Sequence, residues 1–350
     1  MSASGTPRAA GWRWPAEWEP HAATWLSWPH NRQTWPGRLA AAESAFVAMV
    51  RALAGRERVR INVADAAMEG RVRRRLGEGG VDAGAPVEFH AFPTDDAWVR
   101  DHGPVFLVRE GRGERERAVV DFRFDAWGGK YPPWERDDAI PARVAAALGL
   151  PRFAADFVLE AGSVDGDGQG TVLTTEACLL NPNRGPRRTR EWMEQRLHDF
   201  LGAEQVLWLG DGVAGDDTDG HVDDLTRFVA PGRVVTALET DPRDPNHAPL
   251  AENLRRLRGM RDARGRPLEL ATLPMPPPVR VGGERLPASY ANFYLANRVA
   301  LVPVFDVPSD ERALKVLAEL LPQREIVGIS ARDLVLGLGA VHCLTQQEPA

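Results

Sequence analysis

The 350-residue sequence has little of several features that mark particular protein classes. Its two cysteines, Cys178 and Cys343, are too few for a disulfide framework or a zinc site with cysteine ligands only. No stretch approaches the ~18 consecutive apolar residues that a membrane helix needs. Residues 1–11 lack the basic and then apolar layout of a signal peptide. These absences favour a protein of the reducing cytoplasm that does not enter a membrane.

An excess of positive charge is also missing. The 43 basic and 49 acidic side chains leave a formal net charge of −6. This balance argues against nucleic acid as a partner and favours a cationic or neutral one. The hydrophobic share of 43% and the charged share of 26% exclude a wholly disordered chain.

Apolar periodicity predicts short strands that alternate with helices. The predicted helices cover residues 38–54, 71–76, 142–148, 189–201, 250–257 and 310–321. The predicted strands cover residues 59–63, 87–92, 104–108, 118–124, 206–209, 225–229, 234–238, 268–273 and 299–305. Strand–helix–strand units are typical of an α/β fold. No Pro/Gly/Ser-rich linker divides the chain, so we expect a single domain over residues 12–350 and a disordered segment over residues 1–11.

Tryptophan is concentrated at the start of the chain. Six of the eleven tryptophans lie within the first 35 residues, at Trp12, Trp14, Trp18, Trp25, Trp28 and Trp35. Large aromatic rings provide apolar area together with a polar handle. We expect this segment to pack across a core or at the mouth of a site.

Cys343 is the first candidate for chemistry. Gly337 and Gly339 shortly before it allow a ligand to approach the backbone closely. A thiolate is a strong nucleophile when its pKa is lowered or a base is near, although a buried structural cysteine is the more common case. His342 is adjacent, and neighbours on a strand point to opposite faces, so we do not expect His342 to be the partner of Cys343.

His221 and Asp223 form a second candidate. On an extended backbone, residues two apart face the same side, and a histidine beside a carboxylate suits general acid–base work. The pair could equally be half of a metal site, but no second histidine lies within local ligand spacing. The nearby acids at positions 216, 217 and 219 are also explained by a solvated loop.

Two further segments place acids near apolar or aromatic residues. Trp98 lies among the ionisable residues Asp95, Asp96 and Asp101, just before an apolar strand. Glu160 ends the apolar run 157–159, where it is either a surface residue at a strand end or a buried functional acid.

Together, a thiol, a histidine and several carboxylates around a tryptophan suit a planar, delocalised cation. A guanidinium presents five N–H donors in a fixed fork that matches carboxylates bidentately. Two carboxylates would hold such a cation while the cysteine attacks its central carbon.

These segments resemble the agmatine deiminase / bacterial peptidylarginine deiminase family of the guanidino-modifying superfamily. The resemblance begins at Trp-Pro-Ala-Glu-Trp-Glu-Pro-His, residues 14–21, and reaches the Cys343 segment at the C-terminus. Further matching motifs lie at residues 98–101, 126–129, 157–160, 171–176, 208–210 and 220–223. The resemblance implies a fivefold pseudo-symmetric α/β-propeller that uses neither metal nor cofactor, and the homodimer that is common in the family.

Carried over residue by residue, the resemblance implies five catalytic roles. Cys343 matches the nucleophile and His221 the general acid and base. Asp101 and Asp223 match the pair that grips the guanidinium. Glu160 matches the acid that completes the site and orients the histidine.

The resemblance also places Trp98 and Trp127 near the substrate and Asp217 opposite the far amine of agmatine, although packing or solvation explains these three residues as well. The sequence departs from the family pattern at Ala161 and Ala340, and its connections at 129–134 and 274–289 are short. Since loops carry specificity, these departures bear on the substrate and not on the guanidinium chemistry.

The implied reaction is hydrolysis of agmatine to N-carbamoylputrescine and ammonia through a covalent thiouronium intermediate. The alternatives are deimination of peptidyl-arginine or another guanidine, a non-catalytic guanidine-binding protein, and a zinc hydrolase centred on His221.

Overall fold

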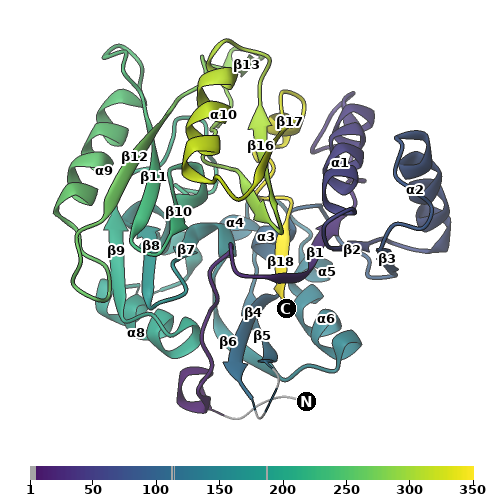
Figure 1. Cartoon of the computed structure of the whole chain (residues 1–350), viewed down its shortest axis with the longest axis horizontal. Coiled ribbons are helices and arrows are strands. Elements are labelled where there is room, and N and C mark those ends of the chain that lie inside the picture. The colour runs from purple at the N-terminus through teal and green to yellow at the C-terminus, as the bar shows by residue number, and fades with distance from the viewer. Residues whose placement is uncertain (1–4, 112, 114, 187) are drawn as a thin grey trace.

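Five small sheets follow one another along the chain, and each repeats the same strand pattern (Figure 1). The computed structural model describes residues 5–111, 113, 115–186 and 188–350. In each sheet the first two strands are antiparallel, and the third strand pairs in parallel with the second. The parallel step needs a crossover, which is where most of the helices lie.

The first sheet joins the two ends of the chain, and it differs from the others by having a fourth strand. Its strands are β18 (Gln346–Pro349), β1 (His21–Ser27), β2 (Arg58–Asn62) and β3 (Val87–His90), with crossover helices α1 (Leu39–Leu53) and α2 (Ala66–Glu78). Helix α1 buries Phe46, Val50 and Leu53, whose spacing of three and four puts them on one face.

The other four sheets have three strands each and follow in chain order. The second contains β4 (Val105–Glu110), β5 (Arg115–Arg123) and β6 (Arg152–Val158), with α4 (Ala126–Gly129), α5 (Glu135–Asp138) and α6 (Ile140–Leu148) in its crossover. The third contains β7 (Val164–Gly166), β8 (Thr171–Thr175) and β9 (Gln205–Leu209), with α7 (Glu176–Leu179), η3 (Pro182–Arg184) and α8 (Arg190–Leu201).

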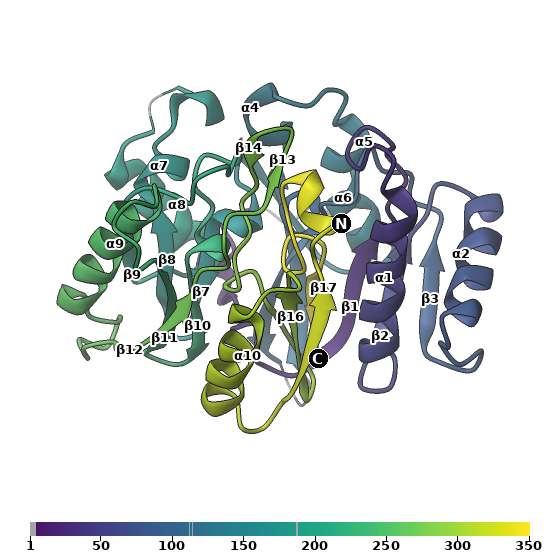
Figure 2. The same ribbon diagram turned by 90° about the horizontal axis from the view of Figure 1, so that it is seen from above.

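The fourth sheet contains β10 (Thr226–Ala230), β11 (Arg233–Leu238) and β12 (Glu269–Pro274), with the crossover helix α9 (His247–Gly259). The fifth contains β15 (Tyr294–Ala296), β16 (Val299–Val304) and β17 (Glu325–Ser330), with α10 (Ser309–Leu320). A small hairpin of β13 (Arg280–Val281) and β14 (Glu284–Arg285) lies between these two sheets in the chain. Helices α2 and α9 lie at opposite edges of the molecule in both views (Figure 1 and Figure 2).

Strand β18 closes the ring by pairing with β1, so that Trp25 lies opposite Gln346. The fully buried carboxylate of Glu348 secures this join. It accepts a hydrogen bond from the Trp25 indole at 2.9 Å and forms ion pairs with Arg60 at 3.1 Å and with Arg117. A buried carboxylate is stable only with such partners, so β18 is fixed by charge as well as by backbone pairing.

The predicted α/β-propeller is confirmed, and each predicted helix and strand overlaps an observed element. The strands that were not predicted are β1, β6, β7, β8, β13, β14, β15, β17 and β18. Strand β18 has the sequence Gln-Gln-Glu-Pro, which shows no alternation of apolar and polar residues. Its buried side chains are polar and find their partners on other segments, so no apolar pattern marks it as a strand. Trp12, Trp25, Trp28 and Trp35 are buried, as expected.

The disorder expected over residues 1–11 is wrong for Arg8–Ala10, which form the 3₁₀ helix η1, while residues 1–4 lie outside the described residues. A backbone hydrogen bond from Gly11 to Arg8 closes this turn at 3.0 Å. Over the described residues, none of the helices has the length and apolar character to cross a membrane.

Replacing Glu348 tests the closure of the ring. Glu348→Ala is expected to lower the free energy of unfolding by about 3 kcal/mol, because buried cationic and N–H groups lose their partner. Urea unfolding followed by circular dichroism measures this change. The matched control, Glu325→Ala, removes a carboxylate that is 61% exposed and pairs with Arg56. Its expected cost is below about 1 kcal/mol, and equal costs for the two variants would contradict the account.

Candidate active site

The candidate residues come from equivalent places in the five sheets. Each lies in the short segment just before the first strand of its sheet, which is a loop, a turn or a single helical turn. These residues are Asp101 in α3 (Val99–His102) before β4, Glu160 preceding η2 (Ala161–Ser163) and β7, Asp223 in η4 (Val222–Asp224) before β10, Asn292 before β15, and Cys343 before β18. The ring of sheets therefore brings one segment from every unit to a common centre.

Cys343 lies at that centre with its side chain almost fully buried. Its Sγ is 3.9 Å from Oδ2 of Asp223 and 3.1 Å from Nδ2 of Asn292. Burial raises the pKa of the Cys343 thiol well above its usual value, and the charges of Asp223, Asp224 and Asp101 raise it further. Without a ligand, the thiol is therefore protonated at neutral pH.

Asp101 and Asp223 flank the thiol as two buried carboxylates. Asp101 accepts hydrogen bonds from the Trp127 indole at 3.1 Å and from the Gly162 amide at 3.2 Å. Burial raises the pKa of Asp101 to about 7, and although the charge of His221 lowers it, the charge of Asp223 adds to the rise. Such a pair is more stable once a cation lies between its members.

Burial alone would raise the pKa of Asp223, but the hydrogen bond and charge of His342 lower it below its usual value. Oδ2 of Asp223 is 2.7 Å from Nδ1 of His342, while its Oδ1 has no hydrogen-bond partner among the described residues. A buried carboxylate oxygen without a donor is ready to accept one from a ligand.

The surroundings of Gly162 leave no room for a side chain. A Cβ at Gly162 would lie 2.6 Å from Oδ1 of Asp101, 2.7 Å from Nδ1 of His221 and 3.1 Å from Oδ2 of Asp223. These polar atoms converge on the backbone of Gly162, so any side chain there would displace them. The neighbouring Ala161, where the sequence departs from the family pattern, does not prevent this convergence.

His221 lies between two carboxylates. Its Nδ1 is 3.7 Å from Asp101 and its Nε2 is 4.0 Å from Glu160, which accepts a hydrogen bond from Arg184 at 3.0 Å. Burial by itself would lower the pKa of His221, but Asp101, Cys178 and Glu160 raise it well above its usual value. The imidazole is therefore held in the protonated form, which can donate a proton to a ligand.

Two backbone expectations were wrong. His221 and Asp223 do not lie on an extended strand, because Val222–Asp224 form the 3₁₀ helix η4. His342 and Cys343 lie in a turn rather than in a strand. The conclusion about His342 still holds, since its Nδ1 binds Asp223 and its Nε2 lies 2.7 Å from Oε2 of Glu17.

Sequence reasoning missed the buried network that supports Asp223. Glu17 connects His342 to Arg227 through an ion pair of 2.9 Å, and Arg227 also pairs with Asp165 at 3.2 Å. Glu17 belongs to the recognised motif at residues 14–21, but no spacing rule links it to a histidine 325 residues away. Asn292 was also missed, because a single asparagine carries no local pattern.

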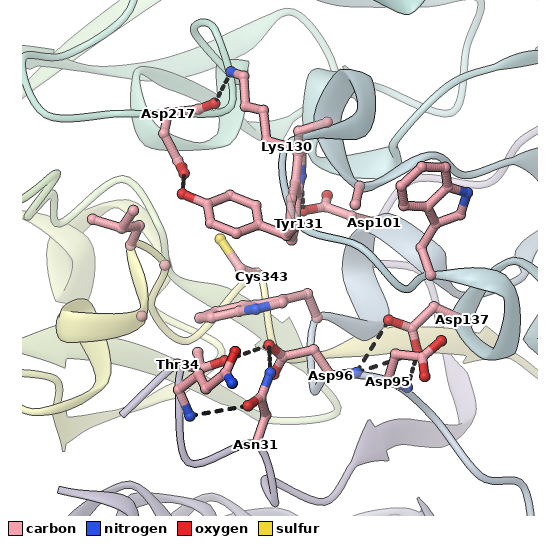
Figure 3. A pocket seen from close by; sticks show the side chains of 18 of the residues that line it. Asn31, Thr34, Asp95, Asp96, Asp101, Lys130, Tyr131, Asp137, Asp217 and Cys343 are labelled. Carbon is pink, nitrogen blue, oxygen red and sulfur yellow. Dashed lines mark hydrogen bonds between the residues drawn. The ribbon is translucent and has the colours of Figure 1, made fainter. Parts of the chain in front are cut away.

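A cavity of about 810 Å³ opens above Cys343 (Figure 3). Its lining includes Trp98, Trp127, Asp101 and Asp217, whereas His221, Glu160 and Asp223 are buried beneath its wall. The predicted residues are thus brought to one region in two layers.

Trp98 stacks on Trp35 at a centroid distance of 5.4 Å and packs so closely on Gly339 that a Cβ there would lie 2.5 Å from its ring. Figure 3 shows two acidic regions in the cavity wall, with Cys343 between them. In one, the Tyr131 hydroxyl donates to Asp217, and Lys130 binds the Asp217 carbonyl and the Asp219 carboxylate.

In the other region, Asp137 accepts the backbone amides of Asp95 and Asp96 at 2.7 and 3.1 Å, and Asp96 also accepts from Asn31 and Thr34. These acids are hydrogen-bonded within the protein, so they support the backbone before Trp98.

Among the described residues, Glu160, Cys178 and His221 could together hold a metal ion, since their ligand atoms lie within 4.8 Å of one another. Cys178 thus lies beside the histidine. The Glu160 carboxylate is already paired with the guanidinium of Arg184, which would compete with a metal ion for it.

A pair of alkylating reagents tests the charge at Cys343. Asp223→Asn is expected to speed alkylation by neutral chloroacetamide at pH 7, because removing the nearby negative charge lowers the thiol pKa. It is expected to slow alkylation by the cationic chloroacetamidine, because half of the cation's site is lost. The rate with chloroacetamidine divided by the rate with chloroacetamide should therefore fall by about tenfold or more.

Cys343→Ala measures any reaction at Cys178, and Asp241→Asn on the exposed surface controls for net charge. A ratio of rates that Asp223→Asn leaves unchanged would show that Asp223 does not act on the thiol.

Comparison with known proteins places the chain in a family. The family described as Porphyromonas-type peptidyl-arginine deiminase matches residues 13–349. An agmatine deiminase of Ectopseudomonas mendocina is 39% identical over 368 residues, covering 99% of this chain and 97% of that protein. An agmatine deiminase of Pseudomonas syringae pv. tomato is 40% identical, with coverages of 99% and 98%.

The solved structure of the agmatine deiminase of Enterococcus faecalis has a TM-score of 0.92 at 34% identity, covering 100% of this chain and 99% of that one. With its centre built from one segment of each of five sheets, the chain belongs to the Porphyromonas-type peptidyl-arginine deiminase family.

Proposed function

We propose that this protein is a hydrolytic deiminase that converts agmatine to N-carbamoylputrescine and ammonia. The observation that carries the proposal is a buried thiol between two buried carboxylates, one of which keeps an oxygen with no donor among the described residues. Two buried carboxylates repel each other when no cation lies between them, and a guanidinium would bind both. Relatives at 39–40% identity over almost the whole chain are named agmatine deiminases.

In the first step, Asp101 and Asp223 accept the N–H groups of the guanidinium and hold its central carbon near Cys343. The positive charge of the substrate favours the thiolate, opposing the burial that raises the thiol pKa, and the thiol proton is released to solvent. The sulfur forms a bond to the central carbon and gives a tetrahedral adduct.

In the second step, protonated His221 donates its proton to one nitrogen, the C–N bond breaks and ammonia leaves. The neutral His221 then takes a proton from water, whose oxygen bonds to the same carbon. Collapse of this second adduct breaks the C–S bond, and the ureido product and the thiolate are released. The hydroxyl proton of the adduct passes to the sulfur, which restores the Cys343 thiol. Two moderate barriers replace one high barrier, as in other covalent mechanisms. The reduced thiol that this cycle needs fits a cytoplasmic location.

Asp217 supports agmatine as the substrate. Its carboxylate lies in the cavity wall at the rim opposite Asp96, where the far ammonium of a guanidine with a short chain could reach it. Burial raises the pKa of Asp217, while the Tyr131 hydrogen bond lowers it. A bound ammonium would replace that hydroxyl as the partner of the carboxylate.

A larger guanidine is the second candidate, and the size of the cavity favours it. At about 810 Å³ the cavity falls in the range of sites for drug-sized ligands, and its wall extends past Cys343 to Asn31 and Thr34. A peptidyl-arginine would occupy this additional space, whereas agmatine would leave it to water.

Ammonia release from agmatine, free arginine and an arginyl peptide separates these candidates. We expect the highest kcat/KM with agmatine and no ammonia from Cys343→Ala. Activity that survives exhaustive chelation excludes the zinc hydrolase. A wild-type protein that binds agmatine without releasing ammonia would be a guanidine-binding protein, and a higher kcat/KM with the peptide would replace agmatine as the substrate.

Asp217→Asn tests the site for the far amine. The variant is expected to raise KM for agmatine by about tenfold, because a charge-assisted hydrogen bond is lost. It should leave KM unchanged for butylguanidine, which has the same chain without the ammonium. An equal rise for both substrates would assign Asp217 to the loop structure and not to the amine.

A further inference from the structure

The fifth sheet contributes a side chain to the centre that the reaction described above does not use. Asn292 is fully buried in the segment before β15, the place equivalent to those of Asp101, Asp223 and Cys343. Its Nδ2 lies 3.1 Å from Sγ of Cys343 and 3.1 Å from Oδ1 of Asp224.

The network around Asn292 fixes which end of the amide faces the sulfur. Its Oδ1 accepts the backbone N–H groups of His342 at 2.9 Å and of Cys343 at 3.4 Å. An amide has two N–H donors and two acceptor lone pairs, and all four are used here. The flipped amide would point its nitrogen at these two backbone donors, so the N–H must face Cys343.

The charges around the sulfur show why such a donor matters. Asp101 in α3 and Asp223 and Asp224 in η4 all raise the pKa of Cys343, and His342 on its own turn is engaged by Asp223 and Glu17. His221 faces Asp101 and Glu160 at 3.7 and 4.0 Å. Among the described residues, Asn292 provides the one side-chain N–H that is hydrogen-bonded to the sulfur.

We propose that Asn292 is a catalytic residue that stabilises the thiolate of Cys343 through its Nδ2–H, and that Asp224 positions it. The proposal rests on the proposed function for its place in turnover. The sulfur is negative twice in that cycle, before it attacks and when the C–S bond breaks. A hydrogen bond to a charged acceptor is stronger than one to a neutral acceptor, so Asn292 stabilises both states more than the neutral thioether between them.

Asn292→Asp separates this role from a structural one, because it keeps the shape and the oxygen that binds the turn but removes the donor to sulfur. Alkylation of Cys343 by chloroacetamide at neutral pH is expected to fall about 10- to 100-fold. Its pH profile should move to higher pH, because the new carboxylate disfavours the thiolate. The kcat for agmatine should fall with the alkylation rate, while KM changes little.

The exchange Asp224→Asn/Asn292→Asp provides the decisive comparison. It preserves the pair between the two positions and the total charge, and it still places an oxygen rather than an N–H against the sulfur. We expect the exchanged protein to fold, as seen by circular dichroism, and to remain slow in alkylation with an alkaline pH profile. Recovery of the wild-type rate and profile would overturn the proposal and assign Asn292 to structure alone.

If Asn292→Asp alone does not fold, the exchanged protein carries the test. Asn253→Asp is the matched control, since Asn253 is a buried asparagine on α9 that binds Gly210 and Asp211 away from the cavity lining. Its alkylation profile should match the wild type. Alkylation needs no guanidine substrate, so the inference can fail or hold independently of the proposed function.

Discussion

The site depends on buried negative charge that the described cationic side chains compensate only in part. Asp101, Asp223 and Asp224 surround the Cys343 thiol, and together with burial they raise its pKa. Arginines are present nearby, but Arg184 is committed to Glu160 and Arg227 to Glu17 and Asp165. A buried charge that is not fully compensated costs free energy. A bound cation removes that cost, which contributes to its binding free energy. The same cation then generates the nucleophile, so binding and activation are one event.

The ring of sheets makes this concentration of charge feasible. Each unit brings the segment before its first strand to the centre, so acids that are distant in the sequence meet there. Close approach needs a residue without a side chain at Gly162, where Asp101, His221 and Asp223 converge. Beneath this layer, the chain from Asp223 through His342 and Glu17 to Arg227 holds the carboxylate in place.

The sequence predicts the chemical groups better than the way in which they are held. Cys343, His221, Asp101, Asp223 and Glu160 follow from ordered motifs, and the structure gathers them in one region. Strands β10 and β11 follow from the apolar runs at residues 225–229 and 234–238. The site residues come from motifs that resemble a known family, and the strands come from residue type and spacing.

The missed features are those in which polar residues are buried by distant partners. Strand β18 has no apolar period, because Glu348 is satisfied by Arg60 and Trp25 from the other end of the chain. The pairing of His342 with Glu17 and of Asn292 with Cys343 depends on closure of the ring. The extended backbone assumed for His221 and Asp223 is wrong because η4 begins between them. Local spacing cannot show a single helical turn inside a loop.

The most direct measurement of the central claim is the ionisation of Cys343 when a guanidinium binds. Rapid mixing with millimolar guanidinium, followed by the ultraviolet absorbance of the thiolate, compares the wild type with Cys343→Ala. The account predicts an increase in thiolate absorbance in the wild type and none in the variant. It also predicts release of a proton, seen as a binding heat that depends on the ionisation enthalpy of the buffer. Saturable binding of the cation with no change in thiolate absorbance and no proton release would contradict it.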